Sequence, residues 1–111
     1  MLAKKYRLPI QEFIGRRGEQ TKTAFFILKS FPPEKDYRRL GAVISGKVLR
    51  KSTPRNRLRR TIFDFFTRQQ KTLPVKDYLI IALVPAARLQ EEELKRELEK
   101  VFNPQILITN N

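Results

Sequence analysis

Residues 77–84, Asp-Tyr-Leu-Ile-Ile-Ala-Leu-Val, form a nearly continuous apolar run of strand length that ends at Pro85. Such a run is typical of a β-strand that is covered on both of its faces. Other parts of the chain must therefore pack above and below this strand. We expect them to be helices, and the fold to be a small sheet with helices packed on it.

One amphipathic helix is predicted before this strand in the sequence and another after it. Residues 54–71 form the first helix, which Ser52 or Thr53 could cap and in which Pro54 suits the first turn. At 100° per residue, one side of this helix collects Leu58, Ile62, Phe65, Phe66 and Gln69. Residues 90–102 form the second helix, with an apolar stripe of Leu94, Leu98, Val101 and Phe102. Both helices therefore have one face to bury.

Three further segments precede the first long helix. Strands are predicted over residues 21–31 and 38–45, and we expect them to pair as an antiparallel hairpin. Gly41, inside the second of them, marks a bulge or a close backbone approach. A short helix is predicted around residues 8–13, ended by Gly15 or Gly18. The element order is then α-β-β-α-β-α, with a parallel strand pair whose crossover should be right-handed.

Positive charge is concentrated in the first two-thirds of the chain. The net charge is +13; residues 1–71 carry 19 basic and 5 acidic side chains, and residues 72–111 carry 5 and 6. Residues 37–63 hold nine Lys or Arg and no Asp or Glu. Such a field attracts a phosphate backbone. The first two-thirds is therefore predicted to face a nucleic acid, with the last third as scaffold.

The strongest local signal is the run Arg-Asn-Arg-Leu-Arg-Arg at residues 55–60. The guanidinium of Arg can bond a phosphate through two N–H groups, and a helix N-terminus favours anions. The amide of Asn56 either bonds a base edge or ribose or satisfies the start of the helix. The predicted RNA-binding residues, including those of the preceding loop, are Lys47, Arg50, Lys51, Arg55, Asn56, Arg57, Arg59 and Arg60.

Several kinds of chemistry are excluded by residues that the chain lacks. It contains no Cys and no His, so disulfides, zinc sites, Cys nucleophiles and His general bases are ruled out. The carboxylates of the basic part lack the spacing of acid–base pairs or two-metal sites. We predict no catalytic residue and no metal site in this chain. No apolar run reaches transmembrane length and no secretory signal is evident, so a cytoplasmic protein is expected.

Aromatic side chains are candidates for stacking on unpaired bases. Phe25 and Phe26 are neighbours in a predicted strand, so they should point to opposite faces, one into the core and one toward a ligand. Phe13 is either a core residue or a ligand contact.

The sequence resembles the bacterial ribonuclease P protein component. The resemblance rests on Arg-Leu-Gly-Ala-Val-Ile-Ser-Gly-Lys-Val at residues 39–48, followed by the Arg-Asn-Arg helix, and it covers roughly residues 6–103. Arg7-Leu8 with Phe13, and residues 77–82 with Pro85, agree with the flanks of the family pattern. Residues 49–54 depart from it, as does Gly46, where the family usually has Lys. A second aromatic expected after Phe13 is missing.

The resemblance implies an α/β (α+β) fold. It would be a two-layer α-β sandwich with a small mixed four-stranded sheet, similar to the second domain of ribosomal protein S5. The family also implies a left-handed crossover around the Arg-Asn-Arg helix, against the general expectation. The chain would form a single RNA-binding domain, 1–111, with a core over residues 6–103. Residues 104–111, which include Ile106-Leu107-Ile108, would be a final strand or a tail.

The resemblance also implies a function, that of protein cofactor of the ribonuclease P ribozyme. The protein would be a monomer in a 1:1 complex that binds ribonuclease P RNA and the 5′ leader of precursor tRNA. It would bind neither DNA nor a membrane. The RNA, which would hold most of the Mg²⁺, would perform the endonucleolytic hydrolysis. Lys47 and the arginines and Asn56 of residues 55–60 would face the catalytic RNA. The cleft for the leader would be formed by Phe13, Phe25 and Phe26.

Two other functions fit the charge. A ribosomal or other structural RNA-binding protein would share the basic helix but have no role in cleavage. A protein-only nuclease would need catalytic side chains that the sequence does not offer. Cleavage of a precursor tRNA, with and without the RNA subunit, separates the three.

Overall fold

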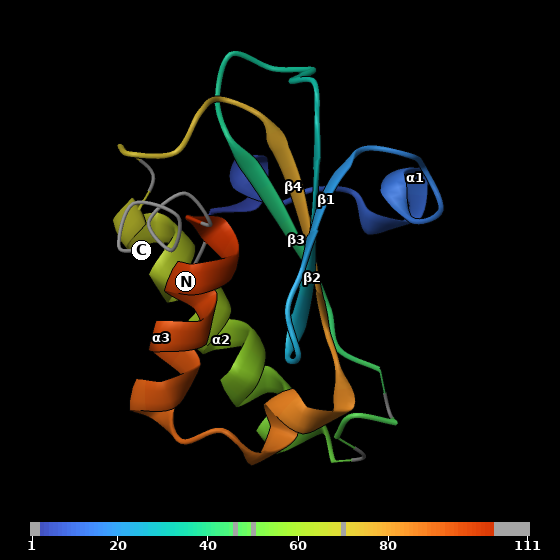
Figure 1. Ribbon diagram of the computed structural model, residues 1–111. Helices are drawn as coiled ribbons and strands as arrows, with labels where there is room; N and C mark the ends of the chain where they lie inside the picture. The colour runs from blue at the N-terminus through green and yellow to red at the C-terminus, as the bar shows by residue number, and fades with distance from the viewer. Residues whose placement is uncertain (1–2, 46, 50, 70, 104–111) are drawn as a thin grey trace.

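A computed structural model describes residues 3–45, 47–49, 51–69 and 71–103, and Ile106–Ile108 lie outside these ranges. Its elements follow the order η1, α1, β1, β2, β3, α2, β4, η2, α3. The helical elements span Lys4–Tyr6 (η1), Ile10–Phe13 (α1), Ser52–Gln69 (α2), Val84–Arg88 (η2) and Glu91–Phe102 (α3). In Figure 1, α2 and α3 lie on one side of the sheet and α1 lies on the other.

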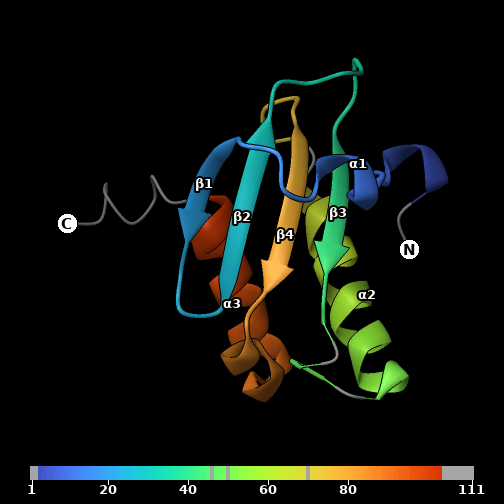
Figure 2. The same cartoon turned by 90° about the vertical axis from the view of Figure 1, so that its right-hand side faces the viewer.

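The sheet has four strands in the order β1-β2-β4-β3 (Figure 2). The strands span Glu19–Lys22 (β1), Phe26–Phe31 (β2), Arg39–Val43 (β3) and Asp77–Ala82 (β4). β2 pairs antiparallel with both β1 and β4, while β3 pairs parallel with β4. The mixed four-stranded sheet is therefore confirmed, and the apolar strand β4 occupies an interior position in which every side chain except that of Ile81 is buried.

The predicted hairpin between residues 21–31 and 38–45 is wrong. β4 lies between these two segments, because its apolar side chains are best buried at the centre of the sheet. The antiparallel hairpin instead forms inside the first segment. There the Thr23 hydroxyl accepts hydrogen bonds from the N–H groups of Phe25 and Phe26 at 3.2 and 3.1 Å and turns the chain from β1 into β2.

The crossover from β3 through α2 to β4 is left-handed, as the resemblance implied and against the right-handed expectation. In Figure 2 both strands run downward, α2 passes behind the sheet, and β4 lies to the left of β3. This path brings the start of α2 to the lower end of β3.

The main core lies between the sheet and the pair α2–α3. Leu58, Ile62 and Phe66 of α2 are buried there, as the helical periodicity predicted. The ring of Phe66 lies edge to face with Tyr78 of β4, with ring centroids 5.8 Å apart. α3 contributes its predicted stripe of Leu94, Leu98, Val101 and Phe102. Burial of one face of α2 leaves its opposite face outward.

A smaller core lies on the other face of the sheet, under α1. It consists of Leu8, Phe13, Phe31 and Leu79. Gly41 is necessary for this packing, because a Cβ atom there would lie 2.9 Å from Ile10 Cγ1 and 3.2 Å from Leu8 Cβ. The predicted close backbone approach at Gly41 is therefore confirmed. Gly15, with φ of 86°, follows α1 in a backbone conformation that favours glycine.

The strand predicted over residues 77–84 ends earlier than expected, at Ala82, and Val84–Arg88 form the 3₁₀ helix η2. α3 then starts with a capping box, in which Gln90 and Glu93 exchange hydrogen bonds between side chain and backbone. Within the described ranges, no helix is long and apolar enough to cross a membrane.

Candidate nucleic-acid interface

The predicted RNA-binding residues lie on the outward side of α2, from Arg55 to Arg60, and in the segment that precedes this helix. Lys47, Lys51, Asn56, Arg57 and Arg60 are exposed, Arg55 and Arg59 are half-buried, and Arg50 lies outside the described residues. We call the group Lys47, Lys51, Arg55, Asn56, Arg57, Arg59 and Arg60 the basic face. Because Leu58 and Ile62 anchor α2 in the core, the part of the basic face that lies on this helix is presented on a rigid element.

The charges of the basic face are placed unfavourably for an isolated helix. The first turn of α2 contains no acidic residue, although the N-terminus of a helix carries partial positive charge. Lys51 and Arg55 add further positive charge at this end. A bound anion would reduce the repulsion between the charged side chains and the helix N-terminus. It would neutralise the side chains and accept hydrogen bonds from backbone N–H groups at that end.

Asn56 has a role that neither alternative from the sequence included. Its side-chain oxygen accepts a hydrogen bond from Arg59 Nη1 at 3.0 Å, one turn further along α2. The bond fixes the direction of the Arg59 guanidinium on the helix surface. Asn56 can therefore act by orienting an arginine.

Two of the three aromatic residues predicted to line a leader cleft are buried. Phe13 and Phe26 have exposed fractions of 1% and 0%, so both are core residues. Phe25 and Phe26 also fail to point to opposite faces of a strand. Phe25 precedes β2, and it packs, half-buried, against the same main core that contains Phe26.

The sheet face that carries α1 has an uncovered part beyond this helix. Strand register places Lys22, Ile27, Ile81 and Val43 side by side across all four strands on this face. Lys22 is exposed and the other three are half-buried, as is Lys29 two residues along β2. We call these five residues the open sheet face. It combines apolar surface with two lysines, and strand alternation alone could have identified it once the strand order was known.

One arginine of residues 37–63, the segment rich in Lys and Arg, is not available to a ligand. Arg39 is buried and forms hydrogen bonds of 2.9 Å from Nε and Nη2 to the two carboxylate oxygens of Asp77, with a third of 3.1 Å to Glu34. The hydrogen bond with Asp77, opposed by burial, raises the pKa of Arg39 above its ordinary value. Arg39 therefore joins β3 to β4.

Arg16 lies at the edge of this cluster and remains accessible. Its guanidinium carbon is 4.3 Å from the ring centroid of Phe13, and Nη1 is 3.6 Å from a carboxylate oxygen of Glu34. Nearly half of its side chain is exposed. Arg16 thus covers the rings of Phe13 and Phe31 in the smaller core and pairs with Glu34.

The described residues hold no group of three or more Asp or Glu side chains placed to bind a metal ion. What they combine is a basic helix face on one side of the sheet and an apolar, lysine-bearing surface on the other. This arrangement can bind two segments of a polyanion.

Comparison with known proteins agrees with these features. A family model described as Ribonuclease P matches residues 4–105. The ribonuclease P protein component of Geobacillus sp. strain WCH70 is 35% identical over 106 residues, which cover 91% of this chain and 90% of the relative. That of Staphylococcus haemolyticus is 31% identical and covers 84% and 86%.

Solved structures share the fold. The RNase P protein of Staphylococcus aureus superposes with a TM-score of 0.82 at 25% identity, covering 90% of this chain and 94% of that one. The RNase P protein from Thermotoga maritima has a TM-score of 0.78 at 23% identity, covering 88% and 96%. The match over nearly the whole chain, together with the left-handed crossover and the Arg-Asn-Arg helix, places this chain in the ribonuclease P protein family.

Proposed function

We propose that this chain is the protein cofactor of a ribonuclease P ribozyme and that it acts in maturation of the 5′ end of tRNA. Membership of the family gives it a role in tRNA 5′ processing as a component of an RNA-containing endoribonuclease. The observation that carries the finer proposal is the basic face of α2, an outward surface of cations on a helix anchored in the core.

In this proposal the basic face binds ribonuclease P RNA. Its side chains form charge-assisted hydrogen bonds to phosphates, and the N-terminus of α2 adds backbone donors. Binding of this kind releases condensed counterions and reduces the repulsion between the two RNA molecules. The cofactor therefore lowers the Mg²⁺ concentration needed for cleavage, while the metal ions themselves are held mainly by the RNA.

The open sheet face holds the 5′ leader of the precursor. A single-stranded segment can lay its bases on Ile27, Ile81 and Val43 while Lys22 and Lys29 approach its phosphates. This replaces the buried Phe13 and Phe26 as the leader contact. The two surfaces lie on opposite sides of the sheet, so the protein can contact both RNA molecules at once in a 1:1 complex in the cytoplasm.

The chemistry belongs to the RNA in this account. The chain has no His and no Cys, and its carboxylates within the described residues form no metal-binding group. The part of the protein is to bind, position and neutralise charge.

The test is cleavage of a precursor tRNA at low Mg²⁺ by a bacterial ribonuclease P RNA, with this protein, without it, and with the protein alone. The proposal expects cleavage only when both components are present. Cleavage by the protein alone would identify a nuclease. Unchanged RNA activity at all Mg²⁺ concentrations, with two bacterial RNAs that are active at high Mg²⁺, would favour a structural RNA-binding protein.

A further inference from the structure

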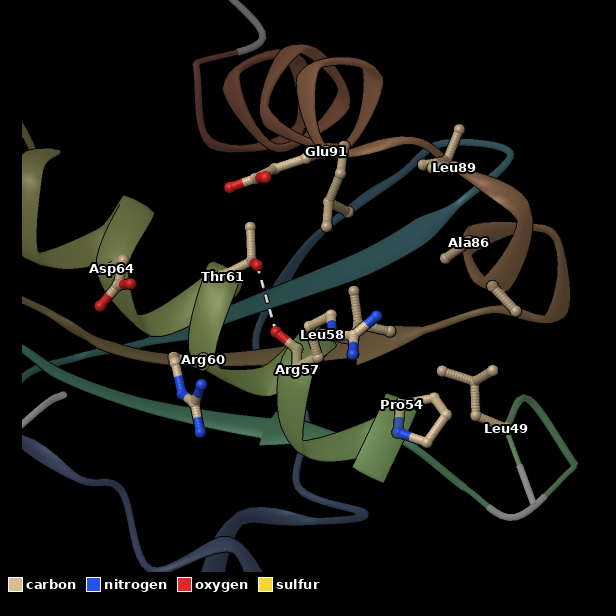
Figure 3. Close-up of a pocket in the computed structure, with 12 residues that line it drawn as sticks. Leu49, Pro54, Arg57, Leu58, Arg60, Thr61, Asp64, Ala86, Leu89 and Glu91 are labelled. Atoms are coloured by element: carbon tan, nitrogen blue, oxygen red, sulfur yellow. Dashed lines mark hydrogen bonds between the residues drawn. The ribbon is translucent and has the colours of Figure 1, made fainter. Parts of the chain in front are cut away.

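A groove of about 380 Å³ runs between the N-terminal half of α2 and the segment formed by η2 and the start of α3. Its apolar surface comes from Leu49, Leu58, Ala86, Leu89 and Leu94. Figure 3 shows Leu49 and Pro54 at one end and Asp64 at the other, with Glu91 of α3 facing Thr61 of α2. Leu49 and Leu89 are only half-buried, so the groove presents apolar surface to its opening.

The groove adjoins the basic face. Arg57 and Arg60 belong to the basic face and also line the groove. An RNA chain that follows these arginines therefore passes the opening. The apolar surfaces that RNA can offer are the faces of its bases, and they become available only when a base leaves its stack.

The polar groups of the groove distinguish a base from a phosphate. Asp64 and Glu91 place carboxylates beside the apolar surface, and one oxygen of Glu91 lies 3.7 Å from Lys95 Nζ. Two carboxylates disfavour a phosphate inside the groove. Carboxylate oxygens accept hydrogen bonds from the exocyclic amino groups of adenine, cytosine or guanine, whereas uracil lacks such a group. Arg57 and Arg60 complement the phosphate of the same nucleotide.

We propose that this groove receives one unpaired, amino-bearing nucleobase of the RNA bound by the basic face. The base lies against the leucine side chains, its amino group donates to Glu91, and its phosphate pairs with Arg57 or Arg60. The inference rests on the proposed function and adds a site that reads a single unstacked base.

The sharpest test uses two neighbouring glutamates of α3. Glu91 lines the groove, whereas Glu92 does not, and both are exposed in the first turn. Charge alone predicts that Glu91→Ala and Glu92→Ala both bind a ribonuclease P RNA transcript equally well or more tightly. Base insertion predicts that Glu91→Ala binds the RNA about 5-fold or more weakly, since it loses a charge-assisted hydrogen bond, while Glu92→Ala does not.

A second variant fills the groove. Ala87 of η2 also lines the groove. Ala87→Trp should weaken RNA binding by about 5- to 100-fold, in the range expected for loss of one base contact, without changing the salt dependence set by the phosphate contacts. Val75→Trp, on the exposed loop between α2 and β4, is the control. Thermal unfolding of both variants separates loss of the site from loss of the fold.

A benzophenone amino acid at position 87 identifies the occupant without relying on a loss of binding. Base insertion predicts a cross-link to one unpaired adenine, cytosine or guanine, mapped by primer extension. Base insertion is refuted if Glu91→Ala binds the RNA as Glu92→Ala does and the cross-links are absent or spread over many nucleotides. The proposed function still stands in that case, provided that the wild-type protein binds the RNA. If wild-type protein does not bind the RNA, the proposed function itself fails.

Discussion

Arg39 of β3 and Asp77 of β4 are register partners across the parallel strand pair, and two hydrogen bonds of 2.9 Å join their side chains. Asp77 is fully buried and Arg39 nearly so. A paired arrangement of this kind satisfies both charges. Removal of Arg39 would leave the carboxylate of Asp77 buried without this partner, and removal of Asp77 would leave Arg39 with only the exposed Glu34. The pair also receives the backbone N–H of Glu34 at 3.4 Å and so fixes the loop before β3.

Removal of one partner should therefore destabilise the fold strongly. We expect Asp77→Ala to lower the free energy of unfolding by about 3–5 kcal/mol, measured by urea denaturation. Lys76→Ala, which breaks the exposed pair with Glu19 at 3.5 Å, is the matched control and should cost less than about 1 kcal/mol. Equal, small effects of the two substitutions would show that the buried pair does not hold β3 to β4.

The basic face is tested by the double substitution Arg57→Ala and Arg60→Ala. It should weaken binding to ribonuclease P RNA and reduce the slope of log K against log salt concentration by about 1–2, because each lost phosphate contact contributes about 0.7–0.9. Helicity, measured by circular dichroism, should not change, since both side chains are exposed. Lys35→Ala with Lys71→Ala removes the same charge elsewhere and should alter the slope less. A retained slope with lost helicity would mean that these arginines are structural.

Orientation of Arg59 by Asn56 predicts coupling between the two residues. Asn56→Ala should weaken RNA binding by about 0.5–1.5 kcal/mol, the net worth of one hydrogen bond. The same substitution should have little effect when Arg59 is already Ala, which a double-mutant cycle measures. Additive effects would indicate that Asn56 contacts the RNA by itself.

Neither the hydrogen bond between Asn56 and Arg59 nor the Arg39–Asp77 pair could be predicted from the sequence, although much of the fold could. The apolar stripe of α2 and its outward cations follow from helical periodicity, which is local. The position of β4 between β2 and β3 is decided by burial across the whole sheet, and neighbouring segments give no sign of it. Arg39 is one of the nine basic residues of 37–63, and the sequence does not reveal that its partner Asp77 lies 38 residues away.

The predictions for Phe13 and Phe26 as leader contacts failed for a related reason, because both are core residues. Phe13, Phe25 and Phe26 are suitable for stacking by residue type, but type does not distinguish a ring in the core from a ring at a ligand. The open sheet face depends on strand order, since Ile27, Ile81 and Val43 become neighbours only after β4 has been inserted.

The open sheet face predicts a specific effect on precursor recognition. Lys22→Ala with Lys29→Ala should weaken the binding of precursor tRNA to the RNA–protein complex but leave the binding of leaderless tRNA unchanged. The reason is that only the precursor carries the single strand proposed to lie there. Lys76→Ala is the charge control. Equal losses for both substrates would contradict a leader site on this face.

Tyr78 gives the protein a distinct response to alkaline pH. Its hydroxyl donates to the Pro74 carbonyl at 2.7 Å, and burial, opposed by the charge of Arg38, raises its pKa from 10.0 to about 12. The neutral phenol is thus favoured in the folded state. Its contribution to the free energy of unfolding is complete below pH 10 and is lost as the pH rises toward 12. We expect a loss of about 2–3 kcal/mol across this range, measured by denaturant unfolding. Tyr78→Phe should lack this component, and an identical pH profile would contradict it.

Directed cleavage of RNA from single cysteines, which the cysteine-free chain allows, can show which RNA lies at the basic face and which lies at the open sheet face. An iron chelate would be attached to Thr53→Cys at the start of α2, to Ala24→Cys beside the open sheet face, or to Val75→Cys as the control. We expect position 53 to cleave ribonuclease P RNA, position 24 to cleave the leader of a bound precursor, and position 75 to cleave neither at these sites. Cleavage of the leader from position 53, or of neither RNA from positions 53 and 24, would contradict this expectation.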